Sequence, residues 1–433
     1  METAEATPLL DVRDLKTYFS LRGSFGSRLI GREAGAVKAV DGVSFQLHHG
    51  EVLGLVGESG SGKTTLGRTI LRLAEATSGS ILMEGTEITG LSESEFRPYR
   101  RRMQIVFQDP HASLNPAMDL LTAVGHPLVI HGLAKSPEAL RAAVGKALTR
   151  VGLTPVDQFF GKAPSDLSGG QKQRAVLARA IILGPELLVA DEPVSMLDMS
   201  VRAKILELML RLKADLDLTY LYITHDLATA KFFCDRIAIM YLGRIVEIGP
   251  TEEIFADPKH PYTVSLLKAI PDPDPSRTVP RDLPRGEVPD AVNPPLGCSF
   301  HPRCPRAFEV CGWESRDLKA LFETRWTKLA EEYFDRERSV MGDLDAMDVP
   351  STTAIVPAAR GRSGEDVLAL LKTMREADPD EPLWRGVESM VAEGDRIRVA
   401  FREPKEPMLG RVGGVEVACH LYDDAVEQRA PSR

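Results

Sequence analysis

The sequence contains a glycine-rich segment whose residue types are suited to binding phosphate. Every fixed position of the pattern GxxxxGK[ST] is filled between Gly57 and Thr64, and the apolar run 52–56 before it predicts a buried strand. The backbone N–H groups of such a loop can point at phosphate oxygens, and the helix expected from about Lys63 adds the positive end of its dipole. We therefore expect the following residues to bind a nucleoside triphosphate: Gly57, Glu58, Ser59, Gly60, Ser61, Gly62, Lys63, Thr64 and Thr65.

Two carboxylates lie further along the chain, at the end of a second apolar run. Residues 187–190 are followed directly by Asp191 and Glu192. Because Mg²⁺ prefers oxygen ligands, the Thr64 hydroxyl and Asp191 are candidates to bind it beside the phosphates. Phosphoryl transfer needs an oriented nucleophile, and Glu192 is the candidate base that polarises the attacking water. The pattern predicts hydrolysis of a nucleotide bound with Mg²⁺.

The segment Leu167-Ser168-Gly169-Gly170-Gln171 lies between the loop and the two carboxylates and restricts the class of enzyme. A phosphate-binding loop alone would leave many nucleotide hydrolases open. With LSGGQ added, the chain resembles the nucleotide-binding subunits of ABC transporters. The resemblance implies an α/β fold over residues 1–250. That fold is a P-loop NTPase core of ABC type with an antiparallel β-subdomain and a helical subdomain at about 111–166.

The same resemblance assigns roles to shorter motifs. It implies that Gln108 touches the magnesium ion and the attacking water, which makes it both a catalytic and a metal-site candidate. It implies that His225 hydrogen-bonds the γ-phosphate, a task suited to imidazole, which can donate without a permanent charge. Asp198 resembles the aspartate of the family's D-loop. Phe19 takes the position of the aromatic side chain that stacks on adenine, with Tyr18 as the neighbouring alternative.

The resemblance also implies that one chain cannot build a complete site. In the family, the residues Ser168, Gly169, Gly170 and Gln171 would contact the ATP held by the phosphate-binding loop of a second subunit. The sequence contains one such loop and one LSGGQ segment. We therefore expect the chain to dimerise with itself or with a paralogous ABC ATPase, and to use ATP and Mg²⁺.

Composition adds information on location and partners. The chain has 433 residues and a net charge of −9, so it lacks the excess of basic residues that favours nucleic-acid binding. Its apolar runs fall short of the ~20 residues that span a bilayer. The N-terminal residues 1–5 lack the basic and apolar regions of a signal peptide, so we expect the chain to stay in the cytosol.

The C-terminal part resembles a specific branch of the transporters. The segments His260-Pro261-Tyr262-Thr263 and 298–305 resemble the C-terminal extension of oligopeptide and dipeptide importer ATPases, here over residues 251–312. Segments 107–116 and 191–195 are similar to the F partner of their paired D and F ATPases. The resemblance implies an ATP-hydrolysing subunit at the cytoplasmic face of the membrane, docked on two permeases and fed by an extracytoplasmic binding protein. Alternatives are an importer of nickel or an oligosaccharide, or a non-transport ABC ATPase.

Four cysteines form a candidate metal site: Cys298, Cys304, Cys311 and Cys419. In a reducing cytosol, such thiols favour metal ligation over disulfides. Some peptide importer ATPases carry a [4Fe-4S] cluster on a similar pattern, and four thiolates suit such a cluster or a tetrahedral Zn²⁺. The third alternative is that these thiols bind no metal. We expect the cluster.

About a hundred residues between Cys311 and Cys419 depart from the family pattern. Apolar residues at helical spacing in 318–333 and 367–374 predict helices. We therefore expect a small α+β insertion over 313–412, either a partner surface or a scaffold, and a return segment over 413–433 that carries Cys419.

Overall fold

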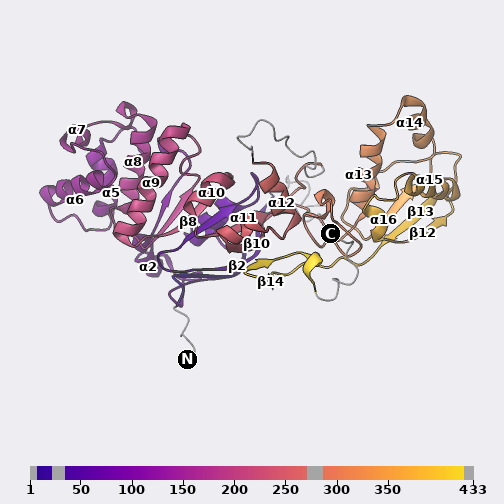
Figure 1. Ribbon diagram of the computed structural model, residues 1–433, viewed down its shortest axis with the longest axis horizontal. Coiled ribbons are helices and arrows are strands. Elements are labelled where there is room, and N and C mark those ends of the chain that lie inside the picture. Colours follow the sequence, from indigo (N-terminus) through magenta and orange to yellow (C-terminus); the bar gives the residue numbers. More distant parts are fainter. Residues whose placement is uncertain (1–6, 22–34, 271–285, 424–433) are drawn as a thin grey trace, which may run out of the picture. The chain divides into compact units, whose positions relative to one another are not determined.

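Buried parallel strands form the centre of the N-terminal part of the chain. The computed structural model describes residues 7–21, 35–270 and 286–423 (Figure 1). They fall into two units, and the first contains the described residues up to 21 and 38–256. Residues 1–5 and 424–433, considered above, lie outside these ranges. The strands of the first unit lie in the order β6 (Met103–Val106), β7 (Leu187–Asp191), β8 (Thr219–Thr224), β3 (Val52–Val56), β9 (Arg236–Tyr241) and β10 (Arg244–Pro250).

All of these strands except β10 are parallel to their neighbours, and β10 turns back antiparallel to β9. Val106 lies opposite Ala190, and Asp191 lies opposite Ile223. The carboxyl ends of β6, β7 and β8 therefore meet at one edge, which is where ligands bind in open α/β sheets.

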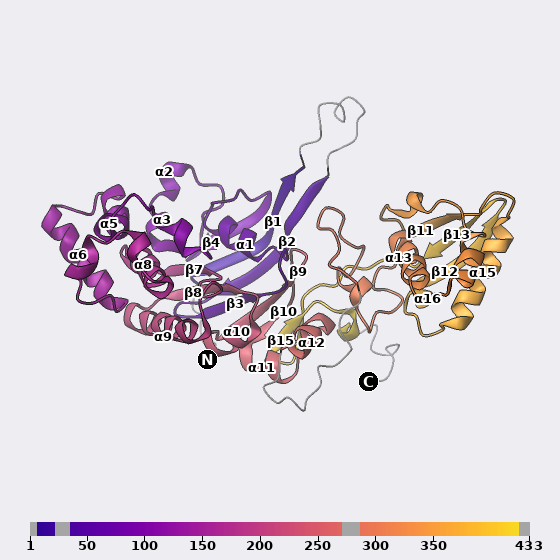
Figure 2. The ribbon, with the colours of Figure 1, turned by 90° about the horizontal axis from the view of Figure 1, so that it is seen from above.

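Helices cover both faces of this sheet, which explains why its strands are continuous apolar runs. Figure 2 shows α1 (Lys63–Ile70) on one face, and α9 (Met199–Leu216) and α10 (Leu227–Phe233) on the other. Gly67 of α1 lies so close to the sheet that an added Cβ would be 2.8 Å from Ile223 and 3.1 Å from Val189. The short helix α11 (Thr251–Ala256) follows β10.

An antiparallel sheet accompanies the central sheet, as predicted. Its strands lie in the order β2 (Ala36–Leu47), β1 (Leu10–Ser20), β4 (Ser78–Met83) and β5 (Thr86–Glu87). Leu10 pairs with Met83 and Lys16 with Ser78. The hydroxyl groups of Thr17 in β1 and Thr69 in α1 hydrogen-bond at 3.0 Å, so this sheet is fixed to the helix after the phosphate-binding loop.

The remaining elements of the first unit are helices between β5 and β7. They are α2 (Glu93–Phe96), α3 (Tyr99–Arg102), α4 (Pro110–Ser113), α5 (Leu120–Ile130), α6 (Pro137–Arg150), α7 (Asp157–Phe160) and α8 (Gly169–Ile181), with a 3₁₀ turn at Pro164–Asp166. Asp119 and Ser136 cap α5 and α6, and Val144, Ala147 and Leu148 of α6 are buried at helical spacing. Helices α5, α6 and α8 pack on one another.

The second unit has its own small sheet. Strands β11 (Thr353–Pro357), β13 (Arg396–Phe401) and β12 (Val387–Glu393) lie antiparallel in that order, and α15 (Gly364–Ala377) packs on them. The other elements are α12 (Pro261–Lys268), α13 (Ser315–Trp326), α14 (Glu331–Arg338), α16 (Leu383–Gly386), β14 (Gly410–Val412), β15 (Val415–Val417) and 3₁₀ turns at His301–Arg303, Asp345–Met347 and His420–Tyr422. The predicted α+β character of the insertion is confirmed.

The helix predicted over 318–333 is divided between α13 and α14, and Tyr333 is exposed. Glu337 of α14 accepts hydrogen bonds from Arg325 at 2.9 Å and from the indole N–H of Trp326 at 3.1 Å. These bonds tie the end of α13 to α14 after the chain has turned. The physical reason for the division is this local reversal, which a periodic apolar pattern does not reveal.

One hydrophobic core runs through the cysteine segment and the insertion. Phe308 and Cys311 are buried in the same cluster as Leu318 and Phe322 of α13 and Val399 of β13. Cys304 and Cys419 pack at the margin of that cluster. The insertion is therefore not a separate body attached to the cysteine segment, because the two share their apolar side chains.

Candidate functional site

The phosphate-binding loop joins β3 to α1 at the carboxyl edge of the central sheet. Gly62 has φ 99°, in the left-handed region, and a Cβ there would overlap the carbonyl oxygen of Ala39. A Cβ at Gly57 would overlap the carbonyl oxygen of Met240. The glycines are thus required by close backbone approach, which gives the loop its shape.

Lys63 folds back into this loop. Its Nζ donates to the carbonyl oxygens of Gly57 at 2.9 Å and Glu58 at 2.7 Å, and to the Ser61 hydroxyl at 3.2 Å. Burial lowers the pKa of Lys63, and the nearby carboxylates of Glu192 and Asp191 oppose this shift. The ammonium group is therefore fixed on the inner side of the loop, where it can attract phosphate oxygens. Ser59 and Gly60 are exposed at the loop tip, and Thr65 follows in α1.

Two of the three predicted magnesium ligands, Thr64 and Asp191, are in direct contact. The Thr64 hydroxyl donates to Oδ1 of Asp191 at 2.9 Å. Asp191 is the last residue of β7, and burial raises its pKa. A hydroxyl and a carboxylate are oxygen ligands of the kind that Mg²⁺ prefers, and such sites use few direct protein ligands. These residues fit the ion that the sequence predicts.

Glu192 is held between the other two predicted catalytic residues. Gln108 donates through Nε2 to Oε2 of Glu192 at 3.0 Å, and Nδ1 of His225 lies 2.9 Å from Oε1. The backbone of Glu192 has φ 46°, and its N–H donates to Ile223 of β8 at 2.9 Å. Left-handed backbone costs about 1 kcal/mol in a residue with a Cβ, and such residues gather at functional sites.

The LSGGQ residues form the exposed N-terminus of α8. The Ser168 hydroxyl accepts from the Gln171 N–H at 3.3 Å, and the Gln171 side chain accepts from the Ser168 N–H at 3.0 Å. This reciprocal cap leaves Ser168 and Gly169 exposed to solvent. Gly170 packs against Val201 of α9. These two hydrogen bonds stay within the turn and do not involve Glu192, Gln108 or His225.

Two further predicted residues lie at exposed ends of elements. Asp198 caps α9, and hydrogen bonds from Ser200 and from the Val201 N–H lower its pKa. Phe19 near the end of β1 is 47% exposed, as an aromatic side chain that stacks on a ligand must be. The Tyr18 hydroxyl instead donates to Asp41, which is paired with Arg244 at 2.6 Å. This network supports Phe19 over Tyr18.

The sequence reasoning did not identify Arg202. Its side chain donates to Asp226, directly after His225, at 3.3 Å and to the carbonyl oxygen of Leu197, directly before Asp198, at 3.4 Å. Arg202 therefore connects the Asp198 turn to the His225 turn. No short motif includes Arg202, because its partners lie 24 and 5 residues away.

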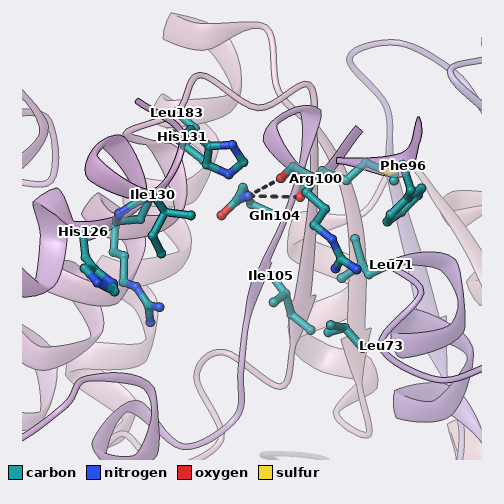
Figure 3. A pocket seen from close by; sticks show the side chains of 13 residues that line it. Leu71, Leu73, Phe96, Arg100, Gln104, Ile105, His126, Ile130, His131 and Leu183 are labelled. Atoms are coloured by element: carbon teal, nitrogen blue, oxygen red, sulfur yellow. Dashed lines mark hydrogen bonds between the residues drawn. The ribbon is translucent and has the colours of Figure 1, made fainter. Parts of the chain in front are cut away.

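A groove of about 210 Å³ lies beside β6 in the first unit. Figure 3 shows His126, Ile130 and His131 on one side and Leu71, Leu73, Phe96 and Arg100 on the other. Arg179 of α8 also lines the groove, donates to the Ser113 carbonyl oxygen at 2.6 Å, and has its pKa lowered by burial. The lining residues include cationic side chains and no carboxylate.

The four predicted cysteines line one small cavity of about 10 Å³ in the second unit, and all are free thiols. The Cys298 N–H donates to the Cys311 carbonyl oxygen at 2.9 Å. Burial, together with the nearby Cys298, raises the pKa of Cys304 to about 12 and raises those of Cys311 and Cys419 as well. The structure thus brings together thiols that are far apart in the sequence.

Sharing a cavity is not the same as forming the ligand shell of one ion. Within the described ranges, the structure contains no group of three or more His, Cys, Asp or Glu side chains that could hold a metal ion. The fifth cysteine, Cys234, is buried in the first unit, where burial raises its pKa. In the same described part of the chain, no helix has the length and apolar character needed to cross a membrane.

Comparison with known proteins identifies two family regions. Residues 40–195 match the family "ABC transporter". Residues 246–311 match "Oligopeptide/dipeptide transporter, C-terminal region". The second match ends where the insertion begins, so the insertion is outside both family regions.

Relatives cover most of the chain. A Brucella ovis protein named for peptide import and ATP binding is 46% identical over 73% of this chain and 95% of its own length. An oligopeptide transport ATP-binding protein of Bacillus subtilis is 46% identical over 74% of this chain and 96% of its own length. This family relationship accounts for the phosphate-binding loop, the two carboxylates and LSGGQ. The chain belongs to the ATP-hydrolysing subunits of ABC transporters of the oligopeptide/dipeptide type.

Proposed function

We propose that this chain hydrolyses ATP to power the import of peptides through a membrane transporter. The observation that carries the proposal is the position of Glu192, held by Gln108 and His225 beside Lys63 and Asp191. The peptide cargo is supported by the C-terminal family region and by the names of the relatives.

Each of the predicted site residues would have its own role in binding or hydrolysing ATP. Lys63 and the amides of 57–62 would bind the β- and γ-phosphates, and Phe19 would stack on the adenine. Thr64 and Asp191, with Gln108 beside them, would hold Mg²⁺, which supplies positive charge for the phosphates. Glu192 would accept a hydrogen bond from the attacking water and orient it for in-line attack. His225 would orient Glu192 and donate to the γ-phosphate.

The exposed Ser168 turn supports a composite site. Its hydroxyl and glycine amides stand at the N-terminus of a helix of 13 residues, a favourable place for the phosphate of another molecule. We infer that a second ABC ATPase, a copy or a paralogue, supplies its phosphate-binding loop opposite Ser168, Gly169, Gly170 and Gln171. Asp198 would line the same interface.

The groove of Figure 3 supports a docking site for a permease. Leu73 and Ile130 are half exposed there, and Arg100, Arg179 and two histidines face the groove with no carboxylate in its lining. A short permease segment with apolar and acidic side chains matches this surface. Through two permeases the subunit would sit at the cytoplasmic face of the membrane, and an extracytoplasmic binding protein would deliver the peptide.

The four cysteines that line one cavity support a [4Fe-4S] cluster, with Zn²⁺ as the alternative, because four thiolates suit either centre.

Glu192→Gln should bind ATP normally and hydrolyse it about a hundredfold or more slowly, because the amide keeps the shape but cannot act as a base. ATP-bound dimers should accumulate and can be counted by gel filtration. Glu207→Gln, an exposed position on α9, is the matched control. Turnover by Glu192→Gln close to that of the control would contradict the assigned role.

Lys63→Ala and Ser168→Arg should fail at different steps. Lys63→Ala should lose ATP affinity in the isolated subunit, because the phosphates lose their cation. Ser168→Arg should bind ATP as the unchanged chain does and fail to form the ATP-bound dimer. Equal loss of affinity in both isolated variants, measured by fluorescent nucleotide titration, would refute the composite site.

Ile130→Glu should abolish assembly with the permeases while leaving ATP binding by the isolated subunit unchanged, because it places an acidic group where the docked segment would lie. Phe232→Glu, an equally exposed position on α10 that does not line the groove, is the control. Co-purification with co-expressed permeases measures the effect. Recovery of intact complex with Ile130→Glu would exclude this groove as the docking site.

Protein purified without oxygen should contain about four iron and four sulfide per chain. Cys304→Ser should lower both contents, and Cys234→Ser should not. About one zinc per chain in colourless protein would replace the cluster with a zinc site. Protein without either metal, with all four cavity thiols alkylated in the native state, would show that the cavity binds no metal.

A further inference from the structure

Two histidines beside the cysteine cavity have an oxygen atom against each ring nitrogen. For His301, Nδ1 is 2.8 Å from the Cys298 carbonyl oxygen and Nε2 is 2.9 Å from Oδ2 of Asp317. For His420, Nδ1 is 2.7 Å from Oδ2 of Asp423 and Nε2 is 2.9 Å from the Lys405 carbonyl oxygen. Each ring is therefore held at two points, by a main-chain carbonyl oxygen and by a carboxylate.

A third histidine in the same lining serves as the contrast. His260 accepts a hydrogen bond through Nδ1 from the Tyr262 N–H at 3.1 Å, and burial lowers its pKa to about 3. It is neutral. His260 thus accepts a hydrogen bond through Nδ1, whereas His301 and His420 face an oxygen atom at each ring nitrogen.

Both of these histidines contact the insertion: His301 contacts the Asp317 side chain, and His420 contacts the Lys405 carbonyl oxygen. Asp317 lies in the first turn of α13 and also accepts from the Glu314 N–H at 2.9 Å. Lys405 follows β13, and its N–H donates to the Val310 carbonyl oxygen at 3.4 Å. Trp313 contacts the His301 ring edge-on, with centroids 5.1 Å apart, and donates to the Phe308 carbonyl oxygen at 2.8 Å.

The insertion supports the cavity from behind its lining. All of the lining residues that the structure describes lie outside 313–412. The side chains of His301 and Asp317 are 0% and 9% exposed, so their bond is shielded from water and is stronger than a surface pair. The contacts run from the insertion to the histidines and from the histidines to the cysteine segments.

We propose that the insertion 313–412 is the scaffold that closes the cysteine cavity, and that it acts through His301 and His420 as positioning residues. The purpose of this scaffold rests on the proposed metal site, since a closed cavity protects a thiolate centre from solvent and oxidants. The contacts that form the scaffold are made within the protein and do not depend on a bound metal. Loss of either histidine contact opens the cavity and leaves the ATPase unit unchanged.

The test measures how fast the cavity thiols react in the folded, full-length chain. The chain is stripped of metal and reduced, then treated with iodoacetamide, and the modification of each cysteine is followed by mass spectrometry. Asp317→Asn should speed the alkylation of Cys298 and Cys304 about tenfold or more, the factor expected when a hydrogen bond to a charged group is lost. His420→Gln should do the same for Cys419.

Three controls separate positioning from loss of stability. Glu323→Gln, an exposed change on the same helix α13, should leave the rates unchanged. Asp317→Glu keeps the carboxylate and should restore most of the protection. Phe322→Leu removes packing from the shared core without touching either histidine, so at a melting temperature equal to that of Asp317→Asn it should keep the thiols protected.

Unchanged alkylation in Asp317→Asn and His420→Gln would overturn the proposal, as would equal exposure of the thiols in Phe322→Leu. Iron and zinc contents are measured separately on unstripped protein. A chain without metal would refute the metal site, and the alkylation rates would still decide whether the insertion closes the cavity.

Discussion

The backbone of Glu192 is the constraint on which the catalytic end of the first unit depends. A left-handed residue with a Cβ persists only where its surroundings hold it. Here β8 accepts its N–H, and Gln108 and His225 hold its carboxylate from two other segments. These contacts require β6, β7 and β8 to end together, which the parallel register provides. The buried sheet and the helices on its faces thus serve to align three strand ends.

Helix α8 extends this alignment to surfaces remote from Glu192. Lys172 lies 3.3 Å from Nδ1 of His111, and Arg179 donates to Ser113, so two points of α8 are tied to the segment that follows Gln108. Its N-terminus carries Ser168, and Arg179 lines the groove. A rigid helix with these two attachments links a change at Gln108 to both the Ser168 turn and the groove, because packed elements move as units.

Motifs and apolar runs predicted the central sheet and most of the nucleotide site, because each depends on residues close together in sequence. Arg202 escaped prediction because its contact with Asp226 exists only after α9 and β8 have packed. The sheet of the insertion also has a signal in the sequence, since Arg396, Ile397, Arg398 and Val399 alternate between polar and apolar residues. The sequence identified the four cysteines. The contacts of His301 and His420 with the insertion depend on where α13 and the 402–409 segment lie. The spacing of residues in the sequence does not predict those positions.

The two cysteines that flank the insertion, Cys311 and Cys419, show where the chain enters and leaves it. Cys311 and Cys419 line the same cavity, so the chain leaves for the insertion and returns at nearly the same place. Domains are tolerated as inserts where entry and exit are close, because the host fold is not stretched. Phe308, which lies outside the insertion, is buried in one core with Leu318 and Phe322, which lie within it. Removing residues 313–412 would therefore expose apolar side chains of the cysteine segment that the insertion now covers.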